Sequence, residues 1–338
     1  MAERPDRNLA LELARVTEAA ALSAARLVGR GDKNAADRAA VDAMRHMLDT
    51  IEMDGTVIIG EGEKDDAPML HNGERIGTGT PPVVDIAVDP LEGTTLTAHG
   101  QPNALAVIAL AEQGTMFDPG PAMYMEKLAT DQEAAHAIDI ERPLEDNLRD
   151  VAQAKGKRVG ELTVVILDRP RHAEAMRTIR EAGARIRLIS DGDVAGAIAA
   201  ARPESPIDLL YGIGGTPEGV LAAAAIRCLG GQICGRLWAR DDAELAAIRE
   251  FGHDPEGVLT RTDLVRGSDV FFAATGVTDG DFLQGVRYHR GGATTESMVM
   301  RSRSGTVRII QSRHNREKLA QYTGERYFAS MAAPTPLS

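Results

Sequence analysis

Apolar residues in the first third of the chain recur at two spacings, which predict helices first and strands afterwards. Leucine, valine and alanine return every three or four residues between Leu9 and Ala20, the spacing of one buried helix face. Short apolar runs bounded by glycine and proline come next, and such runs are typical of strands. The predicted elements are helices at 8–29 and 34–51, strands at 56–60 and 82–90, and a run at 103–114 that fits either a buried strand or a short helix.

After about residue 144 the pattern becomes a regular alternation of strands and helices, which is typical of an α/β protein. The helix "TPEGVLAAAAIRCLGG" has clear end signals, because Thr216 is a favourable N-cap and Pro217 suits the first turn. The last strands are expected to be antiparallel. The predicted strands are 161–168, 184–190, 206–215, 268–276, 285–292, 293–302 and 305–313, and the predicted helices are 171–183, 191–201 and 216–231.

The charge balance limits the classes of partner. Acidic residues outnumber basic ones by 50 to 38 among 338 residues, which gives a net charge of −12. A surface of this sign disfavours nucleic acid and anionic membrane as main partners. An acidic substrate would need a pocket that is locally basic or lined with metal ions. We therefore expect no nucleic acid partner and no membrane partner.

Targeting signals and cysteines indicate the compartment. The stretch "MAERPDRNLALELARV" lacks the apolar core of a signal peptide, and the longest apolar run, 104–111, is too short to span a bilayer. Cys228 and Cys234 are expected to be reduced thiols, with a redox switch as the alternative. These features predict a soluble cytoplasmic protein.

Four short acidic elements lie at predicted strand ends, turns or helix starts, where functional groups collect in α/β folds. In the first, "GDKNAADRAAVDAMR", Lys33 and Asp37 share one helix face; the alternative is a solvated ion pair. In the second, "GEGEKDDAPM", flanking glycines let Glu61 project from a strand end; the alternative is an exposed acidic loop. Three more acids follow in that element, namely Glu63, Asp65 and Asp66.

The third acidic element is "VDIAVDPLEGTTLTA", where an apolar strand ends in carboxylates. Alternation along the strand places Asp85 and Asp89 on the same face, and Pro90 is expected to end the strand because proline cannot continue a central ladder. Glu92 can then lie beside Asp89, and the segment from Gly93 onward offers free backbone N–H groups. This arrangement suits a hard cation and a phosphate together; the alternative is that water solvates the acids.

The fourth element, "GIGGTPEG", does not form a nucleotide-binding loop. The pattern G-x-G-x-x-G needs glycine at position 217, which is Pro217, and no Walker A lysine is present. The glycine-rich turn instead brings Glu218 to a helix N-terminus. Ligands with oxygen only favour Mg²⁺ or Mn²⁺ over zinc, and His172, His289 and His314 are expected at the surface.

Two pairs of charged residues in the second half could bind the rest of a substrate. Arg169 and Arg171 in "DRPRH" follow a predicted strand, and the guanidinium fork suits a phosphate; the alternative is a surface cluster. Asp191 and Asp193 in "DGDVAG" begin a predicted helix. They could cap that helix or accept hydrogen bonds from sugar hydroxyls.

Six motifs cover about residues 9–314 in a characteristic order: "GDKNAAD", "IGEGEKDDAPML", "VDIAVDPLEGT", "YMEKL", "LYGIGGTPEG" and "ATGVTDG". Together they resemble the class II fructose-1,6-bisphosphatases, which are bacterial metal-dependent enzymes of the lithium-sensitive sugar phosphatase superfamily. The resemblance implies a layered α/β/α/β/α sandwich made of two α/β sub-domains. We expect the metal and phosphate sub-domain at 1–143, the sub-domain with sugar and distal-phosphate contacts at 144–330, and a flexible tail at 331–338.

The resemblance also implies an activity, the hydrolysis of D-fructose 1,6-bisphosphate to D-fructose 6-phosphate in gluconeogenesis, with Mn²⁺ or Mg²⁺ as cofactor. Thr94 matches a threonine that helps to activate the attacking water, and Lys33 matches a basic residue near the scissile phosphate; Asp89 and Glu92 complete the implied catalytic set. The implied metal ligands are Asp37, Glu61, Asp89, Glu92 and Glu218. The implied substrate contacts are Glu92, Gly93, Thr94, Tyr124, Arg169, Pro170, Arg171, Asp191, Gly192, Asp193 and Gly215.

Several alternatives stay open at this point. Some relatives have lysine where this chain has Arg169, which keeps the charge but puts the geometry of phosphate binding in doubt. The short segment before "PPVVD" favours fructose bisphosphate over sedoheptulose 1,7-bisphosphate. A phosphatase for inositol, nucleotide or sugar monophosphates would use the same metal acids, and a non-catalytic sensor could share the fold. The family forms homo-oligomers, so a dimer or a tetramer is expected.

Overall fold

The structure is a computed structural model that describes residues 8–62, 69–315 and 318 of the chain. Glu63, Asp65 and Asp66 of the second acidic element lie outside the described residues, and so does the tail expected at 331–338. Within the described part of the chain, no helix combines the length and the apolar character that crossing a membrane requires.

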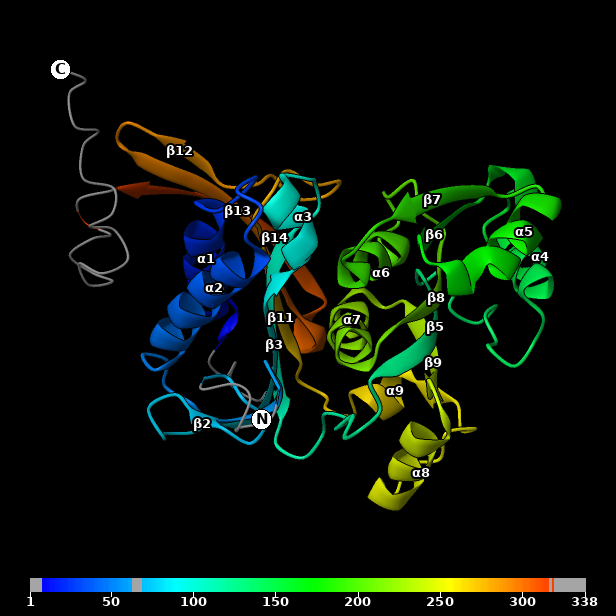
Figure 1. Cartoon of the computed structure of the whole chain (residues 1–338), viewed down its shortest axis with the longest axis horizontal. Helices are drawn as coiled ribbons and strands as arrows, with labels where there is room; N and C mark the ends of the chain where they lie inside the picture. Colours follow the sequence, from blue (N-terminus) through cyan, green and yellow to red (C-terminus); the bar gives the residue numbers. More distant parts are fainter. Residues whose placement is uncertain (1–7, 63–68, 316–317, 319–338) are drawn as a thin grey trace, which may run out of the picture.

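Helices and sheets alternate in five layers (Figure 1). Two sheets of the described residues stand side by side, one pair of helices lies between them, and a further pair covers each outer face. From one side to the other, the helix pairs are α1 (Ala10–Ala25) with α2 (Lys33–Leu48), α6 (Asp193–Ala201) with α7 (Thr216–Leu229), and α4 (Leu144–Ala154) with α5 (Ala173–Glu181). The predicted α/β/α/β/α fold class is confirmed.

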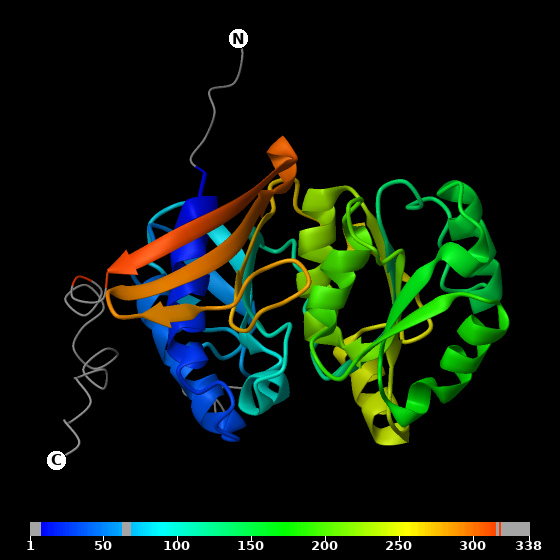
Figure 2. The same ribbon diagram turned by 90° about the horizontal axis from the view of Figure 1, so that it is seen from above.

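The first sheet combines strands from both ends of the chain. Its order is β12-β13-β11-β4-β3-β1-β2, with β14 paired to β13. The strands are β1 (Asp54–Ile59), β2 (Arg75–Ile76), β3 (Val83–Glu92), β4 (Leu105–Glu112), β11 (Phe271–Gly276), β12 (Arg287–His289), β13 (Gly292–Arg301) and β14 (Thr306–Asn315). β1 pairs with β3 in parallel, and the pairings of β11 to β14 are antiparallel, as predicted for the last strands. Seen from above, the long β13–β14 hairpin extends over α1 (Figure 2).

The second sheet has the order β10-β9-β5-β8-β6-β7. Its strands are β5 (Tyr124–Thr130), β6 (Thr163–Leu167), β7 (Arg185–Ile189), β8 (Leu209–Gly215), β9 (Gln232–Trp238) and β10 (Leu259–Thr260), and the shorter or peripheral helices are α3 (Thr94–His99), α8 (Asp242–Phe251) and α9 (Arg261–Leu264). The chain therefore leaves the first sheet after β4 and returns to it with β11. The division into sub-domains at residues 143 and 144 stays a prediction.

Alternating apolar residues of β3 face two different cores. Val84, Ile86 and Val88 belong to the core that α1 and α2 cover, whereas Ala87 belongs to the core around α7. α7 contacts strands of both sheets and is buried on nearly every side, which is why its middle, residues 222–225, consists of alanine alone. This position between the sheets brings the first turn of α7 near the end of β3.

β3 continues to Glu92 and does not end at Pro90, so the predicted strand end is wrong. Its pairing with β1 reaches only Ala87, and its register with β4 shifts between Asp89 and Glu92. The shift is a β-bulge, in which the missing N–H of proline interrupts no ladder bond. The ambiguous run at 103–114 forms β4, a central strand between β3 and β11.

Thr216 is not the N-cap of α7, so this prediction is wrong. Gly215 is the N-cap residue and Thr216 is already helical, while Pro217 does lie in the first turn. The Glu218 side chain lies close to Gly215, where a Cβ would lie 1.8 Å from Glu218 Oε2. The buried hydroxyl of Thr216 has no hydrogen-bond partner among the described residues.

The surface prediction for three histidines holds only for His289, which is exposed. His172 is buried, and His314 is half-buried with its Nε2 2.8 Å from the Thr295 hydroxyl. The rings of His172 and His314 bond to groups of neighbouring strands, and a local sequence pattern does not reveal such contacts.

Cys228 and Cys234 are both buried and free, in agreement with the predicted thiols. Burial raises the pKa of the Cys228 thiol to about 12 and that of the Cys234 thiol to about 11. Neither group forms a reactive thiolate readily at neutral pH.

Candidate active site

The bulge at the end of β3 brings two carboxylates together. Asp89 Oδ1 accepts the backbone N–H of Leu91 at 3.1 Å. Glu92 Oε1 accepts the N–H of Val194, 3.0 Å away in the first turn of α6. That N–H is one of the donors that a helix start leaves without a partner inside the helix. Glu92 therefore joins the end of β3 to the start of α6.

Asp85, which shares a strand face with Asp89, has a different environment. Its Oδ2 accepts the N–H groups of Thr115 at 2.9 Å and of Met116 at 3.1 Å. These bonds satisfy a buried carboxylate and fix the turn after β4. Asp85 therefore has a structural role.

Glu218 completes a group of three carboxylates. Asp89, Glu92 and Glu218 each offer one oxygen, and these oxygens lie within 4.8 Å of one another. Glu218 Oε2 is buried with no hydrogen-bond partner among the described residues. A buried charged oxygen without a partner is costly, and a cation can satisfy all three acids at once. The donors are all oxygen, which fits a hard divalent cation.

Asp37 and Glu61 extend this group towards α2 and β1. Burial, and then the negative charges of Asp37 and Asp89, raise the pKa of Glu61 to about 8. Burial also raises the pKa of Asp37, and the nearby Arg38 opposes that rise. These charge effects place Glu61 within electrostatic reach of Asp37 and Asp89. We refer to the five carboxylates predicted as metal ligands, Asp37, Glu61, Asp89, Glu92 and Glu218, as the acidic cluster.

The other members of the acidic cluster also hold protons more tightly than free carboxyl groups. Burial, assisted by the charge of Glu218, raises the pKa of Asp89 to about 7. Burial and the charges of Asp89 and Glu218 raise the pKa of Glu92 well above its usual value. Burial and the charge of Asp193 raise the pKa of Glu218, while Lys127 acts in the opposite direction. Perturbed carboxyl groups of this kind concentrate at functional sites.

Gly93 and Thr94 turn the chain from β3 into α3. Gly93 has a φ of 86°, which favours glycine, and a Cβ there would lie 2.9 Å from the Leu96 side chain. Thr94 is the first residue of α3 and is half-buried. Lys33 is the first residue of α2 and is exposed, and α2 packs against α3.

A cavity of about 300 Å³ joins the acidic cluster to the arginines of the second half. Glu92 and Glu218 line this cavity together with Arg169 and Arg171. The other predicted substrate contacts that line it are Tyr124, Asp191, Gly192, Asp193 and Gly215. Three further predicted substrate contacts, Gly93, Thr94 and Pro170, do not line this cavity. One cavity thus presents carboxylates and guanidinium groups together.

A buried histidine holds the turn that carries the two arginines. The turn is η2 (Pro170–His172) and follows β6. His172 Nδ1 donates to the Leu167 carbonyl at 2.7 Å, and Nε2 accepts the N–H of Ile213 at 2.8 Å. Burial lowers the pKa of His172, which favours the neutral ring that this bonding requires. The turn is therefore fixed to both β6 and β8.

Arg171 is oriented by a carbonyl group and an aromatic ring. Its Nη2 donates to the Ile213 carbonyl at 2.8 Å, and its guanidinium carbon lies 5.3 Å from the centroid of the Tyr124 ring. The guanidinium of Arg240 lies 5.7 Å from the same centroid. Cation–π contacts therefore hold two guanidinium groups beside Tyr124. No motif singled out Arg240 in the sequence.

Lys127 is a second residue that the sequence interpretation missed. Its side chain is 1% exposed, forms an ion pair with Asp193 and donates to the Gly215 carbonyl at 2.9 Å. The alternative that Asp191 or Asp193 caps α6 is wrong, because the N-cap is Gly192, no side chain caps this helix, and the Val194 N–H bonds to Glu92.

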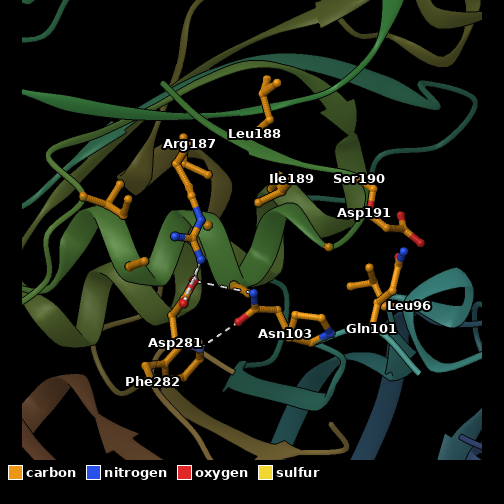
Figure 3. Close-up of a pocket in the computed structure, with 17 residues that line it drawn as sticks. Leu96, Gln101, Asn103, Arg187, Leu188, Ile189, Ser190, Asp191, Asp281 and Phe282 are labelled. Carbon is orange, nitrogen blue, oxygen red and sulfur yellow. Dashed lines mark hydrogen bonds and ion pairs between the residues drawn. The ribbon is translucent and has the colours of Figure 1, made fainter. Parts of the chain in front are cut away.

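A neighbouring cavity of about 240 Å³ shares Asp191 and Gly192 with the first (Figure 3). Arg187 of β7 donates to the two carboxylate oxygens of Asp281 at 2.9 and 3.0 Å, and the Asp281 N–H donates to Asn103 Oδ1 at 2.8 Å. These bonds connect the second sheet to segments that flank β4 and β11 of the first.

Comparison with known proteins gives one consistent result. The sequence profile described as "Bacterial fructose-1,6-bisphosphatase, glpX-encoded" matches residues 7–314. "Fructose-1,6-bisphosphatase 1 class 2" of Escherichia coli (strain K12) is 50% identical over 321 residues, which span 91% of this chain and 95% of that protein. "Fructose-1,6-bisphosphatase class 2" of Shigella flexneri has the same identity and coverage. The chain therefore belongs to the family of bacterial, glpX-encoded fructose-1,6-bisphosphatases.

Proposed function

We propose that this protein hydrolyses fructose 1,6-bisphosphate to fructose 6-phosphate and phosphate in a reaction that depends on divalent cations. Family membership supports the proposal, and one observation carries it: a single cavity is lined by carboxylates of the acidic cluster and by two arginines. A sugar with two phosphates needs both, because cations can hold one phosphate and guanidinium groups the other. A monophosphate would leave the arginines without a role.

The acidic cluster is suited to the cations. Its carboxylates supply oxygen ligands only, three of them (Asp89, Glu92 and Glu218) within 4.8 Å of one another, and the buried Glu218 Oε2 needs a positively charged partner. Mg²⁺ and Mn²⁺ are the proposed ions, since both prefer oxygen ligands. When bound, such ions polarise a phosphoryl oxygen and lower the pKa of a coordinated water.

Residues at the starts of two helices would act on the phosphate that is cleaved. The Thr94 hydroxyl would orient the attacking water and take or relay its proton. Backbone N–H groups at the start of α3 would donate to the phosphoryl oxygens, and Gly93 allows the turn that exposes them. Lys33, at the start of α2, would add positive charge near the same phosphate.

Residues of the second half would hold the other end of the sugar. Arg169 and Arg171, presented by the turn at Pro170, would bind the 6-phosphate next to Tyr124. Asp191 and Asp193 would accept hydrogen bonds from sugar hydroxyls, and Gly192 and Gly215 would leave room for the sugar. Fixing the distal phosphate positions the reacting end of the molecule.

A phosphate-release screen tests this function. The full chain, freed of metal with EDTA, is supplied with Mg²⁺, Mn²⁺ or Zn²⁺ and with fructose 1,6-bisphosphate, sedoheptulose 1,7-bisphosphate, an inositol phosphate or fructose 6-phosphate. We expect efficient release from fructose 1,6-bisphosphate with Mg²⁺ or Mn²⁺ and none in EDTA. Equal turnover of the inositol phosphate would contradict the substrate, and restoration by zinc alone would contradict the choice of ions.

We also propose a cytoplasmic homo-oligomer, either a dimer or a tetramer. Val307 and Ile309 of β14 are exposed apolar residues on a strand that pairs with β13, which suits a subunit contact. The two buried free thiols fit a reducing compartment. Light scattering after gel filtration measures the oligomeric state, and a monomer at micromolar concentration would contradict it.

A further inference from the structure

Lys127 is a lysine of β5 whose ammonium group is withdrawn from solvent. Its side chain is 1% exposed, and its ion-pair partner Asp193 is 7% exposed. Burying an ammonium group is costly unless charge and hydrogen bonds compensate it. The compensation here comes from the Asp193 carboxylate and from the Gly215 carbonyl at 2.9 Å.

Three glycines make room for this lysine and its neighbours. A Cβ at Gly214 would lie 1.9 Å from Asp193 Oδ2 and 2.8 Å from Lys127 Nζ. A Cβ at Gly219 would lie 2.1 Å from the end of Met125 and 3.3 Å from Lys127 Cδ. A Cβ at Gly215 would strike the carboxylate of Glu218. The glycines of "GIGGTPEG", which bind no nucleotide, therefore allow the lysine and the carboxylates to approach the backbone.

The bonds of Lys127 join the starts of two helices that carry the site. Asp193 is the first residue of α6, and the next residue, Val194, donates its N–H to Glu92 of the acidic cluster. Gly215 is the N-cap of α7, three residues before Glu218. Lys127 itself is not among the residues that line the cavity. Among the described residues, the partners of its ammonium group are Asp193 and the Gly215 carbonyl, and neither is an oxygen of the acidic cluster.

We propose that Lys127 is a positioning residue, whose ammonium group fixes the start of α6 relative to the start of α7. The proposal rests on the function proposed above, because Asp193 would contact the sugar and Glu218 would hold a cation. Without the ammonium group, Asp193 turns away from its present position and the Gly215 carbonyl loses its donor. Both changes loosen the separation of Glu92, which is bonded to the start of α6, and Glu218, which lies in the first turn of α7.

The test compares two buried lysines whose bonds lie towards opposite ends of β5 and β8. Lys127→Met removes the ammonium group next to the cavity. Lys155→Met is the matched control, because Lys155 is 6% exposed and bonds Asp131 at 2.8 Å and Asp208 at 2.9 Å, beyond the far ends of β5 and β8. The measurements are the melting temperature, the Mn²⁺ affinity of the full chain by calorimetry, and kcat and KM for fructose 1,6-bisphosphate.

We expect Lys127→Met to weaken Mn²⁺ binding by about tenfold or more, the size of effect seen when a group that orients metal ligands is removed. KM should rise as well, because Asp193 is displaced. Lys155→Met should lower the melting temperature while Mn²⁺ affinity and KM stay within about twofold of wild type. Lys127→Gln keeps a donor for the Gly215 carbonyl and should fall between wild type and Lys127→Met.

The proposal is overturned if Lys127→Met keeps wild-type Mn²⁺ affinity and KM, or if Lys155→Met weakens both equally. If Lys127→Met fails to fold, Mn²⁺ affinity and KM are measured for Lys127→Gln instead. Wild-type values of both in Lys127→Gln would then overturn the proposal. The Mn²⁺ titration separates this inference from the proposed function. A wild-type chain that binds Mn²⁺ but releases no phosphate defeats the proposed function alone, because the effect of Lys127 on Mn²⁺ affinity can still be measured.

Discussion

The two ends of β8 are flanked by carboxylates in opposite states. Asp208, just before β8, is 1% exposed and accepts hydrogen bonds from Lys155 at 2.9 Å, Lys157 at 2.6 Å and the N–H of Thr163 at 3.0 Å. Burial by itself raises the pKa of Asp208, but the bonds from Lys157, Lys155 and Thr163 outweigh it and lower the pKa below its usual value.

Glu218, just after β8, lacks such partners. Its Oε2 has no hydrogen bond among the described residues, and burial raises its pKa. Burial alone therefore does not distinguish a structural carboxylate from a functional one. The difference is the set of partners, because a carboxylate that the fold leaves with a raised pKa is one that a ligand can satisfy.

Asp89→Ala should give the largest effect of the variants, a loss of phosphate release, at the end of β8 where the acidic cluster lies. Losing one cation ligand should cost several kcal/mol of transition-state stabilisation, so phosphate release should fall about a thousandfold or more. Circular dichroism should be unchanged, and the metal-free protein should not melt earlier at pH 8, because a repelling charge is gone. Activity above a few per cent of wild type would contradict the role of Asp89.

Asp208→Ala, at the other end of β8, should lower stability and leave the activity per folded molecule unchanged. Removing this carboxylate leaves Lys155 without one partner and Lys157 without its ion pair, which should lower the free energy of unfolding by about 3–5 kcal/mol. Urea denaturation measures the loss. KM and kcat per folded molecule should be unchanged, and a selective fall in kcat would show that the two ends are not independent.

Arg171→Ala should produce a smaller effect, confined to binding. Loss of charged hydrogen bonds to the distal phosphate should raise KM for fructose 1,6-bisphosphate by about tenfold to a hundredfold. Arg177→Ala is the matched control, since Arg177 is an exposed arginine of α5 that pairs with Glu174. An unchanged KM in Arg171→Ala would favour a monophosphate substrate.

The pH dependence of the metal-free protein should give the smallest effect. The folded-state pKa of Glu61 is about 8 and that of Asp89 about 7, both above the usual values. The folded state therefore binds more protons than the unfolded state between about pH 4 and 8, so stability falls as pH rises through this range. Over the same range, Mn²⁺ affinity should rise, because cations compete with fewer protons.

Glu61→Gln sharpens this measurement. In EDTA, the wild-type melting temperature should fall by a few degrees more than that of the variant between pH 5 and pH 8. Asp208 cannot cause the difference, because its lowered pKa affects stability only as pH falls below its usual titration range. Equal slopes in the two proteins would mean that Glu61 does not carry the raised pKa.

Apolar periods in the sequence predicted most of the elements because these periods are local, whereas the layered arrangement followed from the family resemblance. The helices at 8–29 and 34–51 correspond to α1 and α2, and the alternation in β3 matches the two cores that it faces. The acidic elements could be found because each combines carboxylates with turn residues in one short segment. That residues of different elements belong to one metal site followed only from the family resemblance, and the structure brings Asp89, Glu92 and Glu218 within 4.8 Å of one another.

The remaining features depend on contacts between distant segments. His172 is buried because strands β6 and β8 offer it a carbonyl and an N–H, and neither is visible in "DRPRH". Lys127 pairs with Asp193, 66 positions later in the chain, so nothing local marks it as a buried charge. Pro90 predicts a strand end in the sequence, and the prediction fails because the bulge that accommodates this proline forms only against β4.

The alanines of α7 have a consequence for substrate length. Methyl groups at residues 222–225 fill the space between the two sheets, and interiors this tightly packed accept larger side chains only by moving their neighbours. A valine at these positions would push the sheets apart and lengthen the span between carboxylates and arginines. The distance that a bisphosphate must bridge would then be set by the thickness of a helix in the interior, at residues that do not line the cavity.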